Sequence, residues 1–233
     1  SNDGFSSPQA SLTIEGKRKS LPSAMPSAVV IDTGACLEAP DCLWWSGVGD
    51  LVAKVTAVAD WKMAFREKGE PVNDFAALLS EATVYQFLAR PRRDEGGVRL
   101  LGTALTLNGI AMEMCGSSRP ASGSEHLISH ALDAGSSRPR LHGLQVGVAT
   151  YLMSLVQGQG SERVAAVLDE TCFWKGIEAD PFDRNEWLEA VRRAPEMKQD
   201  YFTVLSSRDC LPEVAEHIET DARLRRCFAL GSC

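Results

Sequence analysis

From about residue 41 to the end of the chain, apolar residues recur every three or four positions, the spacing of one face of an α-helix. The first such run extends from Leu51 to Ala64, directly after the pair Gly49-Asp50. We expect a helix that begins near this pair and ends near Gly69. This periodicity, repeated between glycine and proline residues, predicts a helical domain.

Further helices are predicted from the same pattern. A serine at 122 or 124 should cap one of them, since a serine hydroxyl can accept a hydrogen bond from a free backbone N–H. The expected spans are residues 73–89, 98–115, 124–134 and 142–156, followed by three or four helices centred on Ala165, Trp187 and Ile218.

The first 40 residues have a different pattern. Ser11–Glu15 and Ala28–Asp32 are β-prone runs, and a Lys/Arg/Ser/Pro-rich connection separates them. Two strands cannot form a sheet that is stable by itself. The predicted fold class is therefore predominantly α, with a short β segment before the helical domain.

Charge and composition exclude several classes of function. The chain has 24 Lys and Arg against 31 Asp and Glu, a formal charge of −7, so it has no general basic field for nucleic acid. The longest apolar stretch, Leu101–Met114, is shorter than the roughly 20 residues that span a bilayer. We expect a small-molecule substrate, with neither nucleic acid nor a membrane as partner.

The cysteines indicate the compartment. Seven cysteines are scattered along the chain without a C-x-x-C pair, which argues against a disulfide framework and against a cysteine zinc site. Ser1–Pro8 has neither the charged nor the apolar region of a signal peptide. A cytoplasmic location is therefore expected.

The histidines are clustered. Of four histidines in the chain, His126, His130 and His142 fall within 17 residues. His126 and His130 are spaced i, i+4 and share one helix face. The zincin motif would need Glu after the first histidine, where this chain has Leu127, so metalloprotease chemistry is not expected. The fourth histidine, His217, has no motif around it, and we assign it to a solvated helix face.

A metal site in a helical domain commonly combines ligands from facing helices. His126 and His142 could supply two imidazoles, and Asp50 is a candidate acidic ligand. Two structural readings compete with this hypothesis: the histidines could be hydrogen-bonded core or surface residues, and Asp50 could be a helix N-cap.

Four strings of the chain form a recognisable pattern. They are residues 1–8 (SNDGFSSP), residues 46–61 from SGVGDL to DW, residues 118–130 from SRPASGSEH to His130, and residues 141–147 (LHGLQVG). In both order and spacing, these strings resemble the sn-glycerol-1-phosphate dehydrogenase family. This family is part of the group of iron-containing alcohol dehydrogenases and dehydroquinate synthases, whose members have an N-terminal nucleotide-binding domain and a C-terminal helical domain.

The resemblance implies a domain division and residue roles. Residues 1–40 would be the C-terminal remnant of the nucleotide-binding domain, and residues 41–233 the helical metal and substrate domain. Asp50, His126 and His142 would bind the metal. Asp3, Asp50 and His130 would contact the substrate, with Asp50 and His130 as the catalytic residues, and Ser7 would contact the cofactor.

The resemblance also implies a reaction, the NAD(P)-linked interconversion of dihydroxyacetone phosphate and sn-glycerol 1-phosphate. One carboxylate with two imidazoles suits zinc best, and Ni²⁺ or Fe²⁺ are compatible. The cofactor would be NAD or NADP, and the full-length protein would be a homo-oligomer. Arg119, Arg138, Arg140 and Lys54 are candidates for the substrate phosphate.

The chain departs from the family in one respect. Members of the family have a glycine-rich loop for the cofactor pyrophosphate before these strings, and this sequence has no such loop. The pair Gly96-Gly97 does not qualify, because it follows no predicted strand. We therefore expect a fragment that lacks most of the cofactor domain and is inactive alone. Alternative functions are a glycerol or other polyol dehydrogenase, a lyase of the dehydroquinate synthase type, and a non-catalytic helical module.

Overall fold

Helices form most of the chain, as its apolar periodicity predicts. The computed structural model describes residues 9–14, 17–136, 138 and 140–229. The helices are α1 Thr33–Glu38, α2 Asp41–Val52, α3 Lys54–Lys68, α4 Asp74–Leu88, α5 Glu95–Cys115, α6 Ser124–Gly135, α7 His142–Val156, α8 Ser161–Glu170, α9 Lys175–Glu178, α10 Arg184–Arg193, η2 Ala194–Met197, α11 Val204–Ser207, α12 Leu211–Thr220 and α13 Leu224–Cys227; the strands are β1 Gln9–Ile14, β2 Lys17–Pro22, β3 Phe182–Asp183 and β4 Phe228–Ala229.

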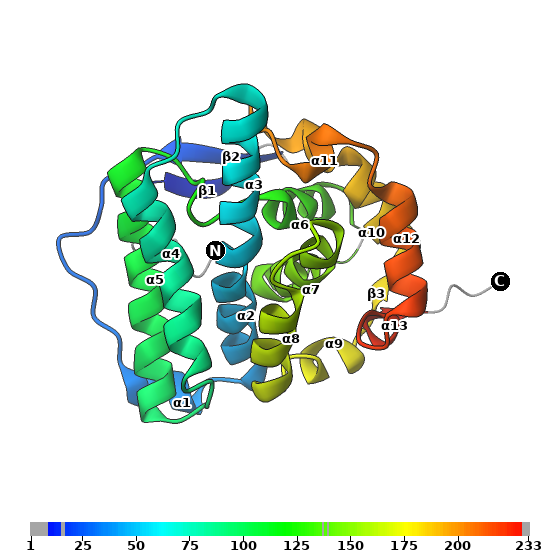
Figure 1. The fold of residues 1–233 in the computed structure, drawn as a ribbon. Coiled ribbons are helices and arrows are strands. Elements are labelled where there is room, and N and C mark those ends of the chain that lie inside the picture. Colours follow the sequence, from blue (N-terminus) through cyan, green and yellow to red (C-terminus); the bar gives the residue numbers. More distant parts are fainter. Residues whose placement is uncertain (1–8, 15–16, 137, 139, 230–233) are drawn as a thin grey trace.

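The core is organised around α7. Nearly every residue of this helix is buried, and α2, α6, α8 and α12 pack against it. Figure 1 shows α4 and α5 on one side of this centre and α10 to α13 on the other. A helix that is apolar all round needs such a central position. The predicted fold class is confirmed.

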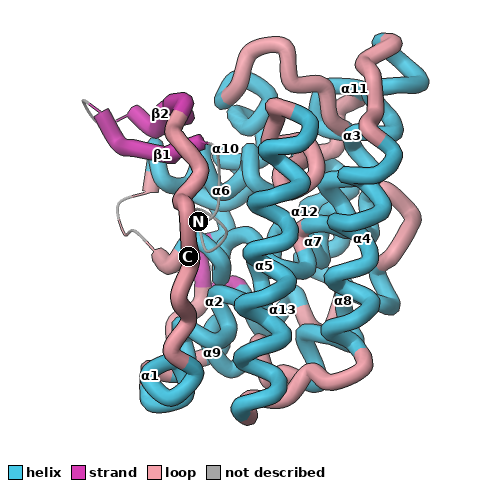
Figure 2. The backbone as a smooth tube through the Cα atoms, turned by 90° about the vertical axis from the view of Figure 1, so that its left-hand side faces the viewer, coloured by secondary structure: helices cyan, strands magenta, loops and turns pink. Residues whose placement is uncertain are grey.

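The β segment differs from the prediction. β1 and β2 form an antiparallel hairpin with Gln9 opposite Pro22 and Ile14 opposite Lys17. Residues 28–31 form no strand but lie in an extended connection that runs down the molecule from the hairpin to α1 (Figure 2). No strand among the described residues lies beside this connection, so it has no partner for a ladder, and Val30 is 93% exposed. The prediction of a strand at Ala28–Asp32 is therefore wrong.

The helix that carries Asp50 also begins elsewhere. We expected a start near Gly49-Asp50, but α2 begins at Asp41 and Asp50 lies in its last turn. The two glycines of this helix, at 47 and 49, lower its intrinsic propensity and hide it from sequence reasoning. Asp50 is thus not an N-cap.

Other boundaries match the prediction closely. α4 and α7 span the expected residues, and α5 begins slightly earlier and ends as expected at Gly116, which has a left-handed φ of 61°. α6 begins after Gly123, without a side-chain cap, so the serine cap is wrong. Within the described part of the chain, no helix is both long and apolar enough to cross a membrane.

Candidate metal centre

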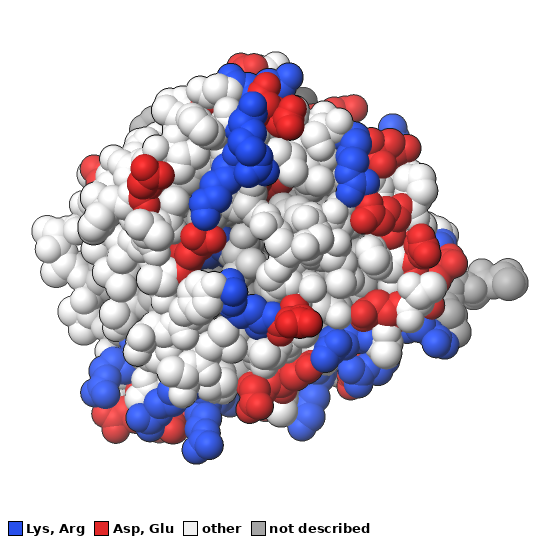
Figure 3. All heavy atoms as spheres, in the orientation of Figure 1, with Lys and Arg blue, Asp and Glu red and all other residues white. Residues whose placement is uncertain are grey.

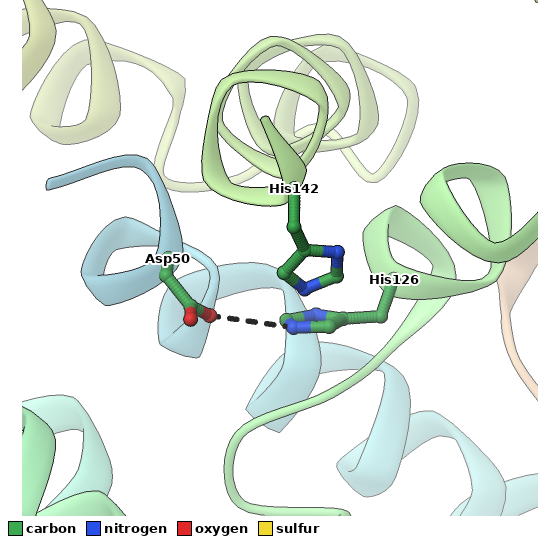
Figure 4. Close-up of side chains that lie close together, drawn as sticks. All are labelled: Asp50, His126 and His142. Atoms are coloured by element: carbon green, nitrogen blue, oxygen red, sulfur yellow. Dashed lines mark ion pairs between the residues drawn. The ribbon is translucent and has the colours of Figure 1, made fainter. Parts of the chain in front are cut away.

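Three helix segments meet at the candidate site. Asp50 lies in the last turn of α2, His126 in the first turn of α6 and His142 at the first residue of α7. Each residue offers one donor atom, and the three atoms all lie within 4.8 Å of one another. Figure 4 shows the two imidazoles and the carboxylate facing a common point. The structure thus brings together the three residues that the sequence suggested as metal ligands.

Glycines allow α2 and α7 to approach closely at this point. A Cβ atom on Gly49 would lie 2.0 Å from the carbonyl oxygen of Gly143, and one on Gly143 would lie 1.9 Å from that of Ser46. No side chain could be accommodated at either position without moving the backbone. This contact sets the spacing between the helices that carry Asp50 and His142.

Asp50 is fully buried, and its charge is balanced from nearby. Lys54 Nζ lies 3.4 Å from Asp50 Oδ1 and 3.3 Å from the carbonyl oxygen of Ala121. Burial alone would raise the pKa of Asp50, but the ammonium of Lys54 and the imidazole of His126 hold it well below its usual range. The group is therefore an ionised carboxylate inside the protein.

His126 lies between two carboxylates. Its Nε2 is 3.4 Å from Asp50 Oδ1, and its Nδ1 is 2.8 Å from Glu125 Oε1. Burial alone would lower the pKa of His126, but its hydrogen bonds to Asp50 and Glu125 raise it to about 8. The Nδ1 contact fixes the ring so that Nε2 points toward Asp50.

Glu125 was not singled out from the sequence. It is fully buried, and its carboxylate accepts hydrogen bonds from the backbone N–H of Gly123 at 2.6 Å and from the Thr56 hydroxyl at 2.8 Å. These hydrogen bonds hold both carboxylate oxygens in place, and Oε1 also contacts His126 Nδ1. Its position directly before a candidate ligand was the available sequence signal.

His142 is oriented by neutral groups. The Ser129 hydroxyl donates its proton to Gln145 Oε1 at 2.7 Å, so it accepts from His142 Nδ1 at 2.9 Å. The Nε2 of His142 then carries a lone pair, and this atom is buried without a hydrogen-bond partner among the residues that the structure describes. Burial and the adjacent His126 hold the pKa of His142 well below its usual range, so the ring is neutral.

This donor set fits a divalent transition metal. A carboxylate and two imidazoles are ligands of catalytic zinc, and ligand histidines usually have their other nitrogen hydrogen-bonded. Both histidines meet this condition, and a cation would also give the buried Nε2 of His142 a partner. The roles assigned to Asp50, His126 and His142 stay predictions.

The remaining candidate site residues divide into two groups. The His130 ring lies 6.4 Å from that of His126 and 6.3 Å from that of His142, one helical turn beyond the three donors. Asp3 and Ser7 lie outside the described residues. A contact of His130, Asp3 or Ser7 with substrate or cofactor stays a prediction.

The candidate phosphate-binding cations have carboxylate partners. Arg119 forms a bidentate ion pair with Glu70, in which Nε lies 2.7 Å from Oε1. Arg138 and Arg140 both form ion pairs with Asp180. Only Lys54 lies beside a proposed ligand. His217 lies on α12, with Nε2 3.9 Å from Glu213 Oε1, away from the cluster.

The class of the protein follows from comparison with known families and folds. Residues 1–40 match the family described as iron-containing alcohol dehydrogenase. The fold is similar to that of a probable glycerol dehydrogenase from Sinorhizobium meliloti 1021, with a TM-score of 0.65, 16% sequence identity, and coverage of 92% of this chain and 67% of that one. The helical architecture of this chain therefore also occurs in that probable glycerol dehydrogenase.

Sequence relatives narrow this class. The chain is 34% identical to the glycerol-1-phosphate dehydrogenases [NAD(P)+] of Methanosphaera stadtmanae and Pyrococcus furiosus, over 93% of this chain and 64% of each relative. It is 35% identical to that of Methanosarcina acetivorans, over 94% of this chain and 62% of the relative. The chain is therefore similar in sequence to glycerol-1-phosphate dehydrogenases, as the sequence motifs predicted, and it spans a little under two thirds of the length of these relatives.

Proposed function

We propose that this chain forms the metal- and substrate-binding part of an NAD(P)-linked oxidoreductase that interconverts dihydroxyacetone phosphate and sn-glycerol 1-phosphate. The relatives named above support the reaction. The observation that carries the proposal is the cluster of donor atoms from Asp50, His126 and His142, all within 4.8 Å of one another, in which the buried Nε2 of His142 has no hydrogen-bond partner among the described residues.

In this proposal Asp50, His126 and His142 hold the ion. Zinc suits the donor set best, and nickel or ferrous iron are compatible. When bound, the metal would act as a Lewis acid toward the carbonyl oxygen of the substrate. His126 would bind the ion through Nε2, the nitrogen that faces Asp50, and a proton carried by this nitrogen would be released to solvent on binding.

The surrounding residues have separate tasks. Glu125 holds the His126 ring through Nδ1, and Ser129, fixed by Gln145, holds the His142 ring. His130 lies one turn beyond the ligands and would contact the substrate hydroxyls rather than the ion. Asp3 would contact the substrate, and Ser7 would contact NAD or NADP.

The domain division follows the resemblance. Residues 1–40 would contribute to the nucleotide-binding domain, and residues 41–233 would form the helical domain. The chain covers a little under two thirds of its relatives' length, so turnover is proposed for a protein of their full length. Comparison of phosphorylated and free dihydroxyacetone as substrates of that protein would distinguish this activity from a glycerol dehydrogenase.

Metal binding by the chain tests the proposal directly. Purified protein is stripped with a chelator, reloaded with zinc and analysed for bound metal, and its zinc affinity is measured by competition with a chromophoric chelator. We expect about one ion per chain. His126→Ala and His142→Ala should each remove most of it, because three protein ligands are reduced to two.

The control for these variants is His217→Ala. This residue is a histidine on a helix, outside the cluster, so its loss should leave the metal content unchanged. Equal zinc occupancy in the parent and in His126→Ala would show that the ligand assignment is wrong.

A further inference from the structure

The loop of residues 118–123 (SRPASG) lies between α5 and α6 and ends directly before the helix that carries His126. It is part of the longest continuous string that resembles the family, yet it supplies none of the three proposed metal ligands. Its contacts fall into two sets, one with partners of the ligands and one with a segment near the end of the chain.

The loop holds the cation that balances Asp50. The Nζ of Lys54 donates to the carbonyl oxygen of Ala121 at 3.3 Å and lies 3.4 Å from Asp50 Oδ1. Lys54 and Asp50 are both fully buried, so their charges depend on nearby polar groups rather than on water. A shift of the loop would therefore displace the ammonium group beside a proposed ligand.

The loop also holds the carboxylate that orients His126. The backbone N–H of Gly123 donates to Glu125 Oε1 at 2.6 Å. The same oxygen lies 2.8 Å from His126 Nδ1. Partners of two of the three proposed ligands are thus fixed by backbone groups of one loop.

Residues 198–204, between η2 and the start of α11, contact this loop through Tyr201. The buried Tyr201 hydroxyl donates to the carbonyl oxygen of Ser122 at 2.5 Å and lies 3.2 Å from Ser118 Oγ. Burial raises the pKa of Tyr201, so the hydroxyl keeps its proton and remains a donor. Ser118 Oγ also accepts from Lys198 Nζ at 2.9 Å.

Arg119 joins the loop to the same segment. On the face of the molecule in Figure 3, Lys and Arg side chains lie at the surface among Asp and Glu side chains, whereas Arg119 is 1% exposed. Its Nη1 donates to the carbonyl oxygen of Phe202 at 2.8 Å, and its Cζ lies 3.8 Å from the centre of the Tyr201 ring. Because a buried guanidinium that loses its partners is costly, the loop and the segment should move together.

Asp60 provides a second connection between the segment and α6. Its carboxylate accepts the backbone N–H of Val204, the last residue of the segment, and that of Ser124, the first residue of α6, at 2.8 and 2.7 Å. The loop is therefore held beside the segment both along its length and at the point where α6 begins.

We propose that Tyr201 is a positioning residue of the metal centre. Through the carbonyl group of Ser122 it fixes the 118–123 loop, and the loop fixes Lys54 beside Asp50 and Glu125 beside His126. This inference rests on the proposed metal site and assigns a role in it to the segment of residues 198–204. Groups that orient metal ligands contribute to metal affinity without coordinating the ion.

The test compares two tyrosine hydroxyls. Tyr201→Phe keeps the ring against Arg119 and removes the hydroxyl, so the 233-residue chain should bind zinc about tenfold more weakly in competition with a chromophoric chelator. Tyr151→Phe makes the same change at another buried tyrosine, whose hydroxyl donates to Asp221 Oδ2 at 2.9 Å, and should stay within about twofold of the parent. Circular dichroism checks that both variants are folded without zinc, since reduced stability of a folded chain does not by itself change its affinity.

A second variant, Ser118→Ala, removes the hydroxyl that contacts both Tyr201 and Lys198, and it should weaken zinc binding about threefold. If Tyr201→Phe does not fold, an unchanged affinity in Ser118→Ala overturns the proposal. If Tyr201→Phe folds and binds zinc like the parent, or no more weakly than Tyr151→Phe, the positioning role is wrong while the metal site stands. A parent chain that binds no zinc, or that binds it equally well as His126→Ala, would overturn the metal site and this inference with it.

Discussion

The helix pair α2 and α7 and the helix pair α4 and α5 depart in opposite ways from the usual distribution of side chains. The first pair encloses charged groups, among them Asp50 and Lys54, both fully buried. The second pair exposes Phe75 and Leu78 to solvent. Buried charges and exposed apolar residues both reduce the stability of an isolated chain, so each departure indicates contact with something else. For the first pair we propose a metal ion.

The largest expected effect concerns the contact between α2 and α7. Gly143→Ala should lower the free energy of unfolding by on the order of 3 kcal/mol or more, because two backbones must separate. Zinc binding should fall with it, since Asp50 and His142 would move apart. Denaturant unfolding and metal analysis measure the two effects.

A glycine elsewhere serves as the control for this variant. At Gly135 of α6 the nearest atom to an added Cβ is the flexible end of Arg193, at 3.1 Å. Gly135→Ala should therefore change stability by less than about 1 kcal/mol. If both substitutions cost the same, the glycine contact does not set the spacing of the helices.

His130 should separate substrate contact from metal binding. In a protein of the relatives' full length, His130→Ala should keep its zinc content and lower turnover on the order of 10²-fold, if the imidazole assists proton transfer. Loss of zinc would make His130 a ligand instead. Unchanged kinetics would assign it a structural role.

Glu125 should influence the affinity for zinc without coordinating the ion. Glu125→Gln removes the negative charge that holds His126 Nδ1 and should weaken zinc binding about 10- to 100-fold, as measured by chelator competition. Glu162→Gln makes the same chemical change on the exposed surface of α8 and should leave the affinity at the parental value. If both variants bind zinc like the parent, the His126 ring does not need this carboxylate.

The success of sequence reasoning differed between the two helix pairs. α4 and α5 were located well because Pro91 and Gly116 mark their ends and because their apolar residues are periodic. The start of α2 was missed, since its glycines serve packing against α7 and have low helix propensity.

Within the candidate site, the ligand residues could be inferred and their supports could not. His126 and His142 stand out as rare residues close together in sequence. Glu125, Ser129 and Gln145 are common residue types, and only the fold shows that they orient imidazole rings. The exposure of Phe75 and Leu78 on α4 was likewise not predicted, because a sequence pattern does not distinguish a buried apolar face from an exposed one.

A further expected effect is a pH dependence of stability that arises from Asp60 on α3. Burial, reinforced by the nearby Glu125, raises the pKa of Asp60 from its ordinary value of 3.8 to about 6. As the pH rises from about 4 to about 6, the folded chain must ionise a carboxyl group that is already ionised in the unfolded chain. The parent should therefore lose stability relative to Asp60→Asn across this range. If the difference in free energy of unfolding between the parent and Asp60→Asn stays constant from pH 4 to pH 7, this prediction is wrong.

Asp60 also has a consequence for the order in which the protein is made. Its Oδ2 accepts the backbone N–H of Ser124 at the start of α6, and its Oδ1 accepts that of Val204, near the end of the chain, at 2.7 and 2.8 Å. During synthesis the helix that carries His126 leaves the ribosome long before residue 204 does. The carboxylate bridge that anchors this helix can therefore close only after Val204 has been translated, so the final geometry around His126 is completed only then.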